Sequence, residues 1–192
     1  MDLLIDIATT APVAIAPPAP ASAPSPTAAN AAWCVVHTRS RQEKALAEDL
    51  EMLGIPCYLP LVRTVRYYGR RKLACSLPLF PGYLFLCGSK ADLITADRTR
   101  RVVRYIKPPN AEVLRAELDS VRRALECGGE LAPTPMLRAG VLVEITSGPF
   151  RGVRGVVASM KDASRIVLNV DLIGRAAALE IERDLLRPVE AV

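Results

Sequence analysis

The side chains in this chain that are best suited to chemistry or binding are basic and aromatic, rather than nucleophiles or metal ligands. The 192 residues include one histidine, His37, and five cysteines without a CxxC pair. His37 has no neighbouring acid or nucleophile in the sequence, and no phosphate-loop or catalytic-triad motif occurs. A single histidine and the lack of a CxxC pair do not favour a cysteine–histidine metal site. We therefore expect no enzymatic activity, no metal and no cofactor.

Positive charge is concentrated in one part of the chain. Between Trp33 and Lys107 there are 14 Lys and Arg against 6 Asp and Glu, whereas from Gly140 onward the count is 7 against 7. A localised basic field is typical of a nucleic-acid-binding domain, because neutralising phosphates supplies most of the sequence-independent affinity. An ordinary solvated basic surface is the alternative that these counts leave open.

The first expected helix carries part of this positive charge at its beginning. Ser40 and Glu43 have the spacing of a capping box, and an apolar repeat follows them. Arg39, Arg41 and Lys44 gather at the same end. Positive side chains oppose the helix macrodipole there, so helix stability does not explain them. Contact with phosphate groups would explain them.

Aromatic side chains cluster in the stretch from Leu77 to Leu86. Pro81 and Gly82 break the approach, and an apolar run with the composition of a buried strand follows them. Tyr83 and Phe85 lie on the same face of that strand by alternation. The stretch is either a core strand entered through a turn or an aromatic docking surface, and its residues alone leave both possibilities open.

The order of the remaining elements predicts two domains. Residues 1–32 form an Ala/Pro-rich tail that is expected to be disordered and that lacks the Lys or Arg of a signal peptide. Residues 33–127 read as strand, helix, several strands, helix, strand and helix, which indicates an α+β sandwich with a largely antiparallel sheet. Residues 128–139 are a Gly/Pro-rich linker. Residues 140–192 contain five short strands, which suggests a small closed barrel.

The location and redox state of the protein follow from the same composition. No stretch is long and apolar enough to be a membrane span. We expect a reducing, cytoplasmic environment, in which the cysteines of apolar strand-like runs pack as small buried side chains.

Several stretches together resemble the NusG family of transcription elongation factors, in particular its specialised RfaH-like branch. The first half is similar to the NusG N-terminal (NGN) domain in the strand at Trp33, in Cys57–Pro60 and in Pro78–Phe85. The second half is similar to a KOW domain, in Gly140–Ile145, Ser147–Gly152 and Leu172–Arg175. The resemblance implies a ferredoxin-like α/β sandwich followed by an SH3-like KOW β-barrel.

The resemblance also implies a function and its site residues. It implies a factor that promotes processive transcription by binding RNA polymerase at the clamp helices of the largest subunit and at the gate loop. The residues at matching positions for the polymerase are Tyr83, Phe85, Phe80, Leu93, Ile94 and Thr95. Those matching the face toward the non-template DNA strand are Arg39, Arg41, Gln42, Lys44, Thr99, Arg100 and Arg101.

The KOW resemblance implies further partners for the second half. Phe150, Ile173 and Arg175 match positions that contact a small-subunit ribosomal protein or the termination factor Rho. We expect the protein to act as a monomer and as a specialised NusG paralogue. A KOW-type RNA- or ribosome-binding module without polymerase contact is the alternative, although its barrel would be net neutral.

Overall fold

The computed structural model describes residues 32–68, 71–138, 140–158 and 165–189. The predicted disordered tail lies outside these residues, except for Ala32, which begins the first strand. No helix within the described ranges is long and apolar enough to cross a membrane. The chain has a mixed α+β fold with antiparallel sheets, which confirms the predicted fold class.

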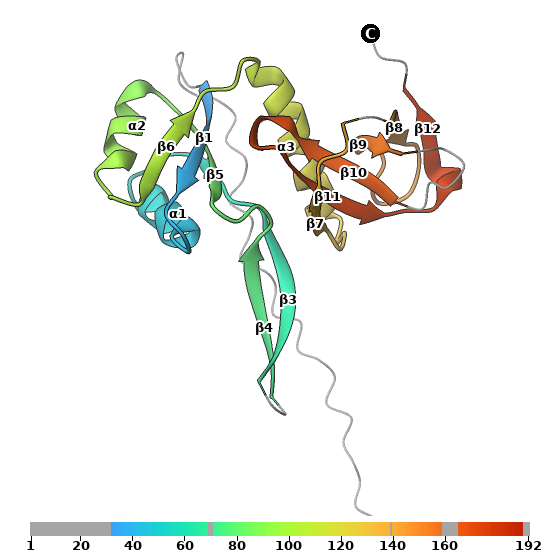
Figure 1. Cartoon of the computed structure of the whole chain (residues 1–192), viewed down its shortest axis with the longest axis horizontal. Coiled ribbons are helices and arrows are strands. Elements are labelled where there is room, and N and C mark those ends of the chain that lie inside the picture. Colours follow the sequence, from blue (N-terminus) through green and yellow to red (C-terminus); the bar gives the residue numbers. More distant parts are fainter. Residues whose placement is uncertain (1–31, 69–70, 139, 159–164, 190–192) are drawn as a thin grey trace, which may run out of the picture.

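The first domain is built on a four-stranded antiparallel sheet in the order β2-β5-β1-β6 (Figure 1). Its strands are β1 (Ala32–Thr38), β2 (Cys57–Tyr58), β5 (Tyr83–Gly88) and β6 (Val102–Ile106). Helices α1 (Glu43–Met52) and α2 (Lys90–Asp97) cover one face of this sheet. Helix α3 (Ala111–Glu126) covers the opposite face. The result is a sandwich with helices on both faces.

The helix starts agree only partly with the sequence-based expectations. The sequence predicts Asn110 as the N-cap of the last helix in the first half, and Asn110 does cap α3 by accepting hydrogen bonds from first-turn N–H groups. The capping box predicted between Ser40 and Glu43 is wrong, because α1 begins after Gln42 without a side-chain cap. The carboxylate of Glu43 instead accepts a hydrogen bond from the backbone N–H of Gly82, at 2.7 Å.

A long two-stranded hairpin extends from the first domain. It consists of β3 (Leu61–Tyr68) and β4 (Arg71–Pro78), which pair with each other in a separate sheet (Figure 1). The sequence suggests one strand over 57–66, but the structure divides it into β2 and β3. Pro60 lies between them, and since it has no N–H it interrupts the ladder. Its carbonyl accepts from the N–H of Leu79.

The second domain is a six-stranded antiparallel sheet in the order β12-β8-β9-β10-β11-β7, called here the C-terminal sheet. Two 3₁₀ turns, η1 (Asp171–Ile173) and η2 (Arg183–Leu185), connect its last strands. The strands are β7 (Ala132–Pro135), β8 (Val141–Ile145), β9 (Arg154–Val157), β10 (Arg165–Val170), β11 (Arg175–Glu180) and β12 (Leu186–Pro188).

Strand β7 lies inside the segment predicted as a linker. It pairs with β11, with Pro133 opposite Ala177 and Pro135 opposite Arg175. Two prolines are tolerated because β7 is at the edge of the sheet, where alternate N–H groups need no partner. The connection between the domains is therefore also an edge strand of the C-terminal sheet.

Two apolar cores hold these layers together. The smaller core lies between the first sheet and helices α1 and α2, and includes Leu46, Leu50, Leu84 and Leu86. The larger core begins on the other face of the sheet, continues across α3 and ends inside the C-terminal sheet. A single cluster therefore links the two domains.

All five cysteines are free, with Cys34 and Cys87 buried.

Candidate functional site

The aromatic strand β5 has a core on each of its two faces. Leu84 and Leu86 point into the smaller core, as alternation predicts. Phe85 points into the larger core and is 0% exposed. Its ring lies 6.2 Å from that of Phe80 in an edge-to-face arrangement. Tyr83, at the beginning of the strand, is only half-buried.

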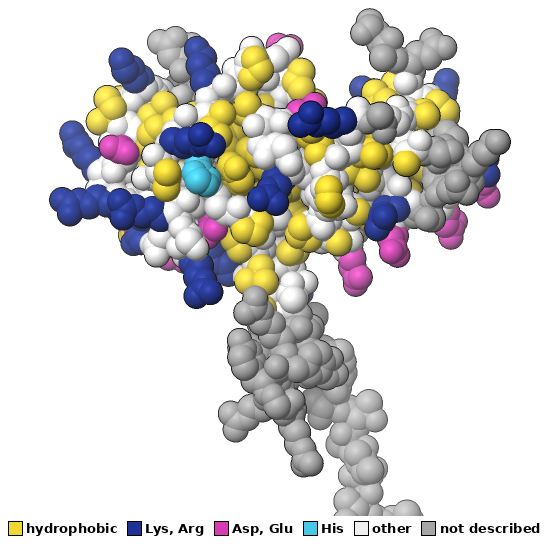
Figure 2. Space-filling model, in the orientation of Figure 1, with side chains coloured by type: hydrophobic (Ala, Val, Ile, Leu, Met, Phe, Trp, Pro, Cys, Tyr) yellow, Lys and Arg dark blue, Asp and Glu magenta, His cyan; other side chains and the backbone are white. Residues whose placement is uncertain are grey.

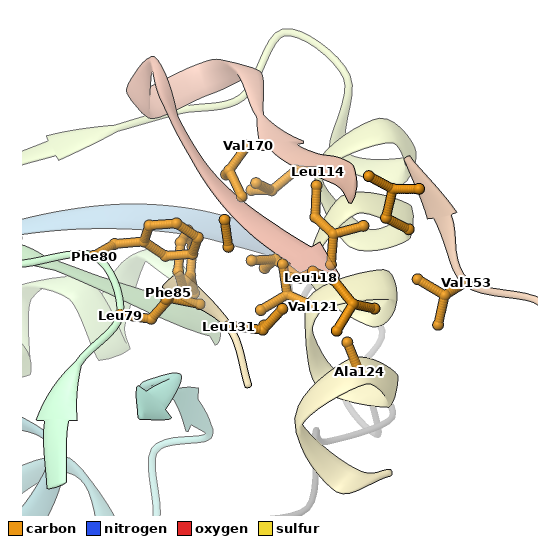
Figure 3. Packing of buried hydrophobic residues seen from close by; sticks show 14 of the residues in the cluster. Leu79, Phe80, Phe85, Leu114, Leu118, Val121, Ala124, Leu131, Val153 and Val170 are labelled. Carbon is orange, nitrogen blue, oxygen red and sulfur yellow. The ribbon is translucent and has the colours of Figure 1, made fainter. Parts of the chain in front are cut away.

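Helix α3 and the C-terminal sheet cover the aromatic residues. Figure 3 shows Phe80 and Phe85 on one side of the larger core and Leu118 and Val121 of α3 on the other. Leu131, just before β7, lies between the two groups in this view. The expected docking surface is thus closed by the protein's own chain at Phe85 and open only at Tyr83.

The α2 residues expected at a second protein contact have different environments. Leu93 packs against the smaller core, and the hydroxyl of Thr95 donates to the carbonyl of Ala91 in its own helix. Ile94 is 53% exposed and is the member of this group available to a partner.

Two loops bring the basic residues together at one edge of the first sheet. The loop between β1 and α1 carries Arg39 and Arg41, and the loop between α2 and β6 carries Arg100 and Arg101. The N–H of Arg39 donates to the carbonyl of Arg101, at 2.8 Å. The sequence resemblance groups these residues, and the structure joins the two loops by a backbone hydrogen bond.

Arg41 and Arg100 have left-handed backbone conformations, with φ of 60° and 58°. Non-glycine residues rarely adopt this region, which costs on the order of 1 kcal/mol or more per residue. Strain of this kind is concentrated at binding sites, where the surrounding fold holds a side chain in a required position. Both side chains are exposed.

The remaining basic-face residues separate into exposed and internally bonded groups. Arg101 forms an ion pair with Asp49 at 2.7 Å and donates to the side chain of Gln42. Thr99 donates its hydroxyl to the carbonyl of Ala96. Arg101 and Gln42 therefore join the two loops, and Thr99 bonds within its own loop. The exposed cationic members are Arg39, Arg41, Lys44 and Arg100.

Glu43 connects the basic loops to the aromatic strand, and its role was missed from the sequence. The residue is 6% exposed, and its carboxylate bonds the N–H of Gly82, immediately before Tyr83. The carbonyl of Gly82 accepts from the N–H of Thr38 at 2.9 Å. Gly82 has a φ of 86°, which favours glycine. Only the capping-box spacing from Ser40 draws attention to Glu43 in the sequence, and that motif predicts a different bond.

The three candidate residues of the C-terminal sheet do not share one surface. Phe150 is half-buried and lines a groove together with Pro149, Ile181 and Leu185. Ile173 is 9% exposed and belongs to the larger core. Arg175 is exposed on β11. In this conformation Phe150 and Arg175 are accessible to a partner and Ile173 is not.

A carboxylic acid lies at the contact between α3 and the C-terminal sheet. Glu117 of α3 accepts a hydrogen bond from the N–H of Asp171 in η1, at 3.2 Å. Burial raises the pKa of Glu117 to about 7, the hydrogen bond from Asp171 lowers it, and the Asp171 carboxylate raises it further. The packing of α3 against the C-terminal sheet, called here the closed state, therefore favours the protonated form of Glu117.

The stability of this contact is expected to depend on pH. Because packing of α3 against the C-terminal sheet raises the pKa of Glu117, protonation of Glu117 stabilises this contact. The stabilisation is fully present at a pH below 4.5, the ordinary pKa, and is lost as the pH rises through about 7. Trp33 is the only tryptophan and lies in the larger core, so its emission reports opening. We expect a red shift between about pH 5 and pH 8. Glu117→Gln should abolish it, whereas Glu130→Gln, at an exposed position, should not; a persistent shift in Glu117→Gln would contradict this assignment.

Comparison with known proteins gives a consistent family. Residues 31–139, more than half of the chain, match the family model described as transcription termination factor nusG. A transcription termination/antitermination protein NusG from Vibrio cholerae is 26% identical over 172 residues, covering 78% of this chain and 91% of the relative. The corresponding protein of Yersinia pestis is 25% identical over 151 residues, covering 75% and 83%.

A solved structure of Thermotoga maritima NusG, described as showing domain interaction, is 20% identical. The match covers 84% of this chain and 98% of that chain, with a TM-score of 0.42.

Proposed function

Because the chain belongs to the NusG family, we propose that it is a transcription elongation and antitermination factor that binds RNA polymerase and the non-template DNA strand. The observation that carries the proposal is the position of the aromatic strand β5 next to the two basic loops, joined through Glu43 and Gly82. An aromatic anchor and a basic face on one sheet suit a partner that presents protein and nucleic acid together.

The polymerase contact is proposed at Tyr83, Phe85 and Phe80, with a second contact at the exposed part of α2 around Ile94. Phe85 is fully buried, so a polymerase helix can reach it only after α3 or the C-terminal sheet moves. Tyr83 is half-buried and is accessible before that movement. We propose that polymerase binding and domain opening are coupled, because a partner that binds only the open form shifts the equilibrium toward it.

The DNA contact is proposed at the exposed cations Arg39, Arg41, Lys44 and Arg100. Gln42, Thr99 and Arg101 support it by bonding within and between the loops. No covalent step is required, since stabilising the closed, processive polymerase is a binding effect. Recruitment to a restricted set of long operons, as a specialised RfaH-like paralogue, belongs to the same proposal.

The C-terminal sheet supplies a surface for a further partner, which we propose to be a small-subunit ribosomal protein or Rho. Phe150 and Arg175 are its accessible residues. The alternative function, an RNA- or ribosome-binding module without polymerase contact, would need cations around this sheet. Residues 140–192 carry 7 Lys and Arg against 7 Asp and Glu, which favours the transcription factor.

The polymerase contact is tested with Tyr83→Ala. Removing an interface aromatic is expected to weaken binding to purified RNA polymerase by about 30-fold or more. Val113→Ala, which truncates an exposed apolar residue of α3, serves as the matched control. Binding is measured by co-purification and by titration, with thermal unfolding to verify the fold. Equal affinity of folded Tyr83→Ala and the unchanged protein would contradict the assignment.

A further inference from the structure

The segment that connects the two domains is bonded at several points along its length. Its first part is held by α3, because the N–H of Gly129 donates to the carbonyl of Ala124 at 2.8 Å. Leu131 is 6% exposed and belongs to the larger core. The next four residues form β7, which lies beside β11 (Figure 1). The composition of this segment predicts a flexible tether, but its described residues are folded against the two domains.

The sequence of β7 alternates between residues that can donate to β11 and residues that cannot. In an antiparallel pair, every second residue directs its N–H and C=O groups toward the neighbouring strand. Because proline has no N–H, Ala132 and Thr134 are the positions of β7 that can donate to β11. The N–H positions on the outer edge then belong to Pro133 and Pro135, which leave no donor for a further strand. β7 therefore pairs with β11 and ends the sheet.

A side chain of β10 fastens the residues that follow β7. The N–H of Leu137 donates to Oδ1 of Asn169 at 3.2 Å, and Nδ2 of Asn169 donates to the carbonyl of Leu137 at 2.8 Å. A carboxamide supplies both an acceptor and a donor, so Asn169 satisfies both backbone groups of one residue as a neighbouring strand would. This pair of bonds extends the attachment of the segment beyond β7.

The segment crosses the outer face of β11 to reach Asn169. Pro135 is opposite Arg175 of β11, whereas Asn169 lies in β10, on the other side of β11. Ala177 packs in the larger core, so its neighbour Ala176 projects from the outer face. Ala176 is nevertheless 1% exposed. The crossing segment accounts for this burial, because alanine is small enough to lie beneath a backbone.

We propose that β7 and the Asn169–Leu137 bonds form a latch that keeps residues 132–137 on the C-terminal sheet when the two domains separate. The inference rests on the domain opening of the proposed function, because the closed domains form one continuous surface (Figure 2). With the latch in place, residues 128–131 alone connect the domains and span at most about 14 Å. With the latch released, residues 128–139 span up to about 42 Å.

The latch therefore sets how far the C-terminal sheet can move from the first domain. A short connection keeps the sheet at a high effective concentration near whatever the first domain binds, and a long one gives access to more distant partners. Arg175, an accessible residue of the proposed partner surface, is opposite Pro135 of the latch. A partner bound at Arg175 lies beside β7, so partner binding and latch release act on the same edge of the sheet.

The latch is tested by backbone amide exchange in the full chain, expressed as protection factors. Leu137 is expected to be protected in the unchanged protein, and Asn169→Ala should lower its protection by about tenfold. Val167→Ala changes the same face of β10 but leaves the Asn169–Leu137 bonds in place, so it should alter the protection of Leu137 by less than about twofold. Equal protection of Leu137 in folded Asn169→Ala and the unchanged protein would refute the latch. Thermal unfolding verifies that each variant is folded.

Comparison with Asp171 separates the latch from closure of the domains. The N–H of Asp171 donates to Glu117 of α3, so its protection reports the closed state. As the pH is raised to about 8, Asp171 should lose protection while Leu137 keeps it. Loss of both together would show that β7 only follows closure, and the latch would be overturned. If Asp171 stays protected throughout, the domain opening of the proposed function fails, and the effect of Asn169→Ala on Leu137 still decides the latch.

Discussion

Phe85→Ala is expected to lower the free energy of unfolding by about 3–5 kcal/mol. The side chain is 0% exposed and contacts the rings of Phe80 and Tyr58 in the larger core. Removing it deletes buried apolar area and leaves a cavity, because the sheet and α3 relax only partly. The measurement is urea denaturation followed by Trp33 emission.

The control for this prediction is Phe85→Leu, which retains most of the apolar volume and should destabilise less. A loss below about 1 kcal/mol in Phe85→Ala would mean that the side chain is not enclosed in solution. The size of the loss also decides how binding data are interpreted. A polymerase-binding defect in Phe85→Ala would mix lost contact with unfolding, which is why Tyr83 is the cleaner position for the functional test.

Glu43→Ala is expected to destabilise the first domain by about 1–3 kcal/mol, the cost of leaving a partly buried donor unpaired. The donor is the N–H of Gly82, whose position sets the start of β5. Glu43→Gln keeps an oxygen acceptor at the same distance from the backbone and should lower the free energy of unfolding by less. Urea denaturation gives the stability, and backbone amide exchange at Gly82 reports the bond.

Amide exchange at individual residues distinguishes the loss of this bond from a general loss of packing. In Glu43→Ala, exchange should accelerate at Gly82 and Tyr83 more than at Leu50, which lies in the core of the same helix. Uniform acceleration would show that Glu43 acts only through global stability. Because Glu43 begins the helix behind the basic loops, the local result would also show that these loops and the aromatic strand share one support.

Part of each domain could be predicted from the sequence. The apolar runs 102–106 and 141–145 predict strands, and β6 and β8 have these bounds, because short apolar runs flanked by turns specify strands locally. Asn110 caps α3 as expected, since an N-cap depends only on neighbouring residues. β7 was not predicted, because a strand with prolines at alternate positions is stable only when a neighbouring edge, here β11, is available.

The candidate sites show the same division between local and tertiary information. The identity of the basic residues follows from the sequence, but their separation into exposed cations and bonded supports does not. Arg100 and Arg101 are adjacent, yet Arg101 pairs with Asp49 of α1 whereas Arg100 is exposed. A partner 52 positions away leaves no local signal.

The sequence by itself determined that β5 is an aromatic strand entered at Pro81 and Gly82, and that Tyr83 and Phe85 share a face. Alternation fixes which side chains lie together, because it depends only on the extended backbone. It cannot specify what covers that face. The tertiary structure decided that α3 and the C-terminal sheet enclose Phe85 and leave Tyr83 beside His37, because burial depends on elements that are distant in the chain and meet only when the two domains pack around one core.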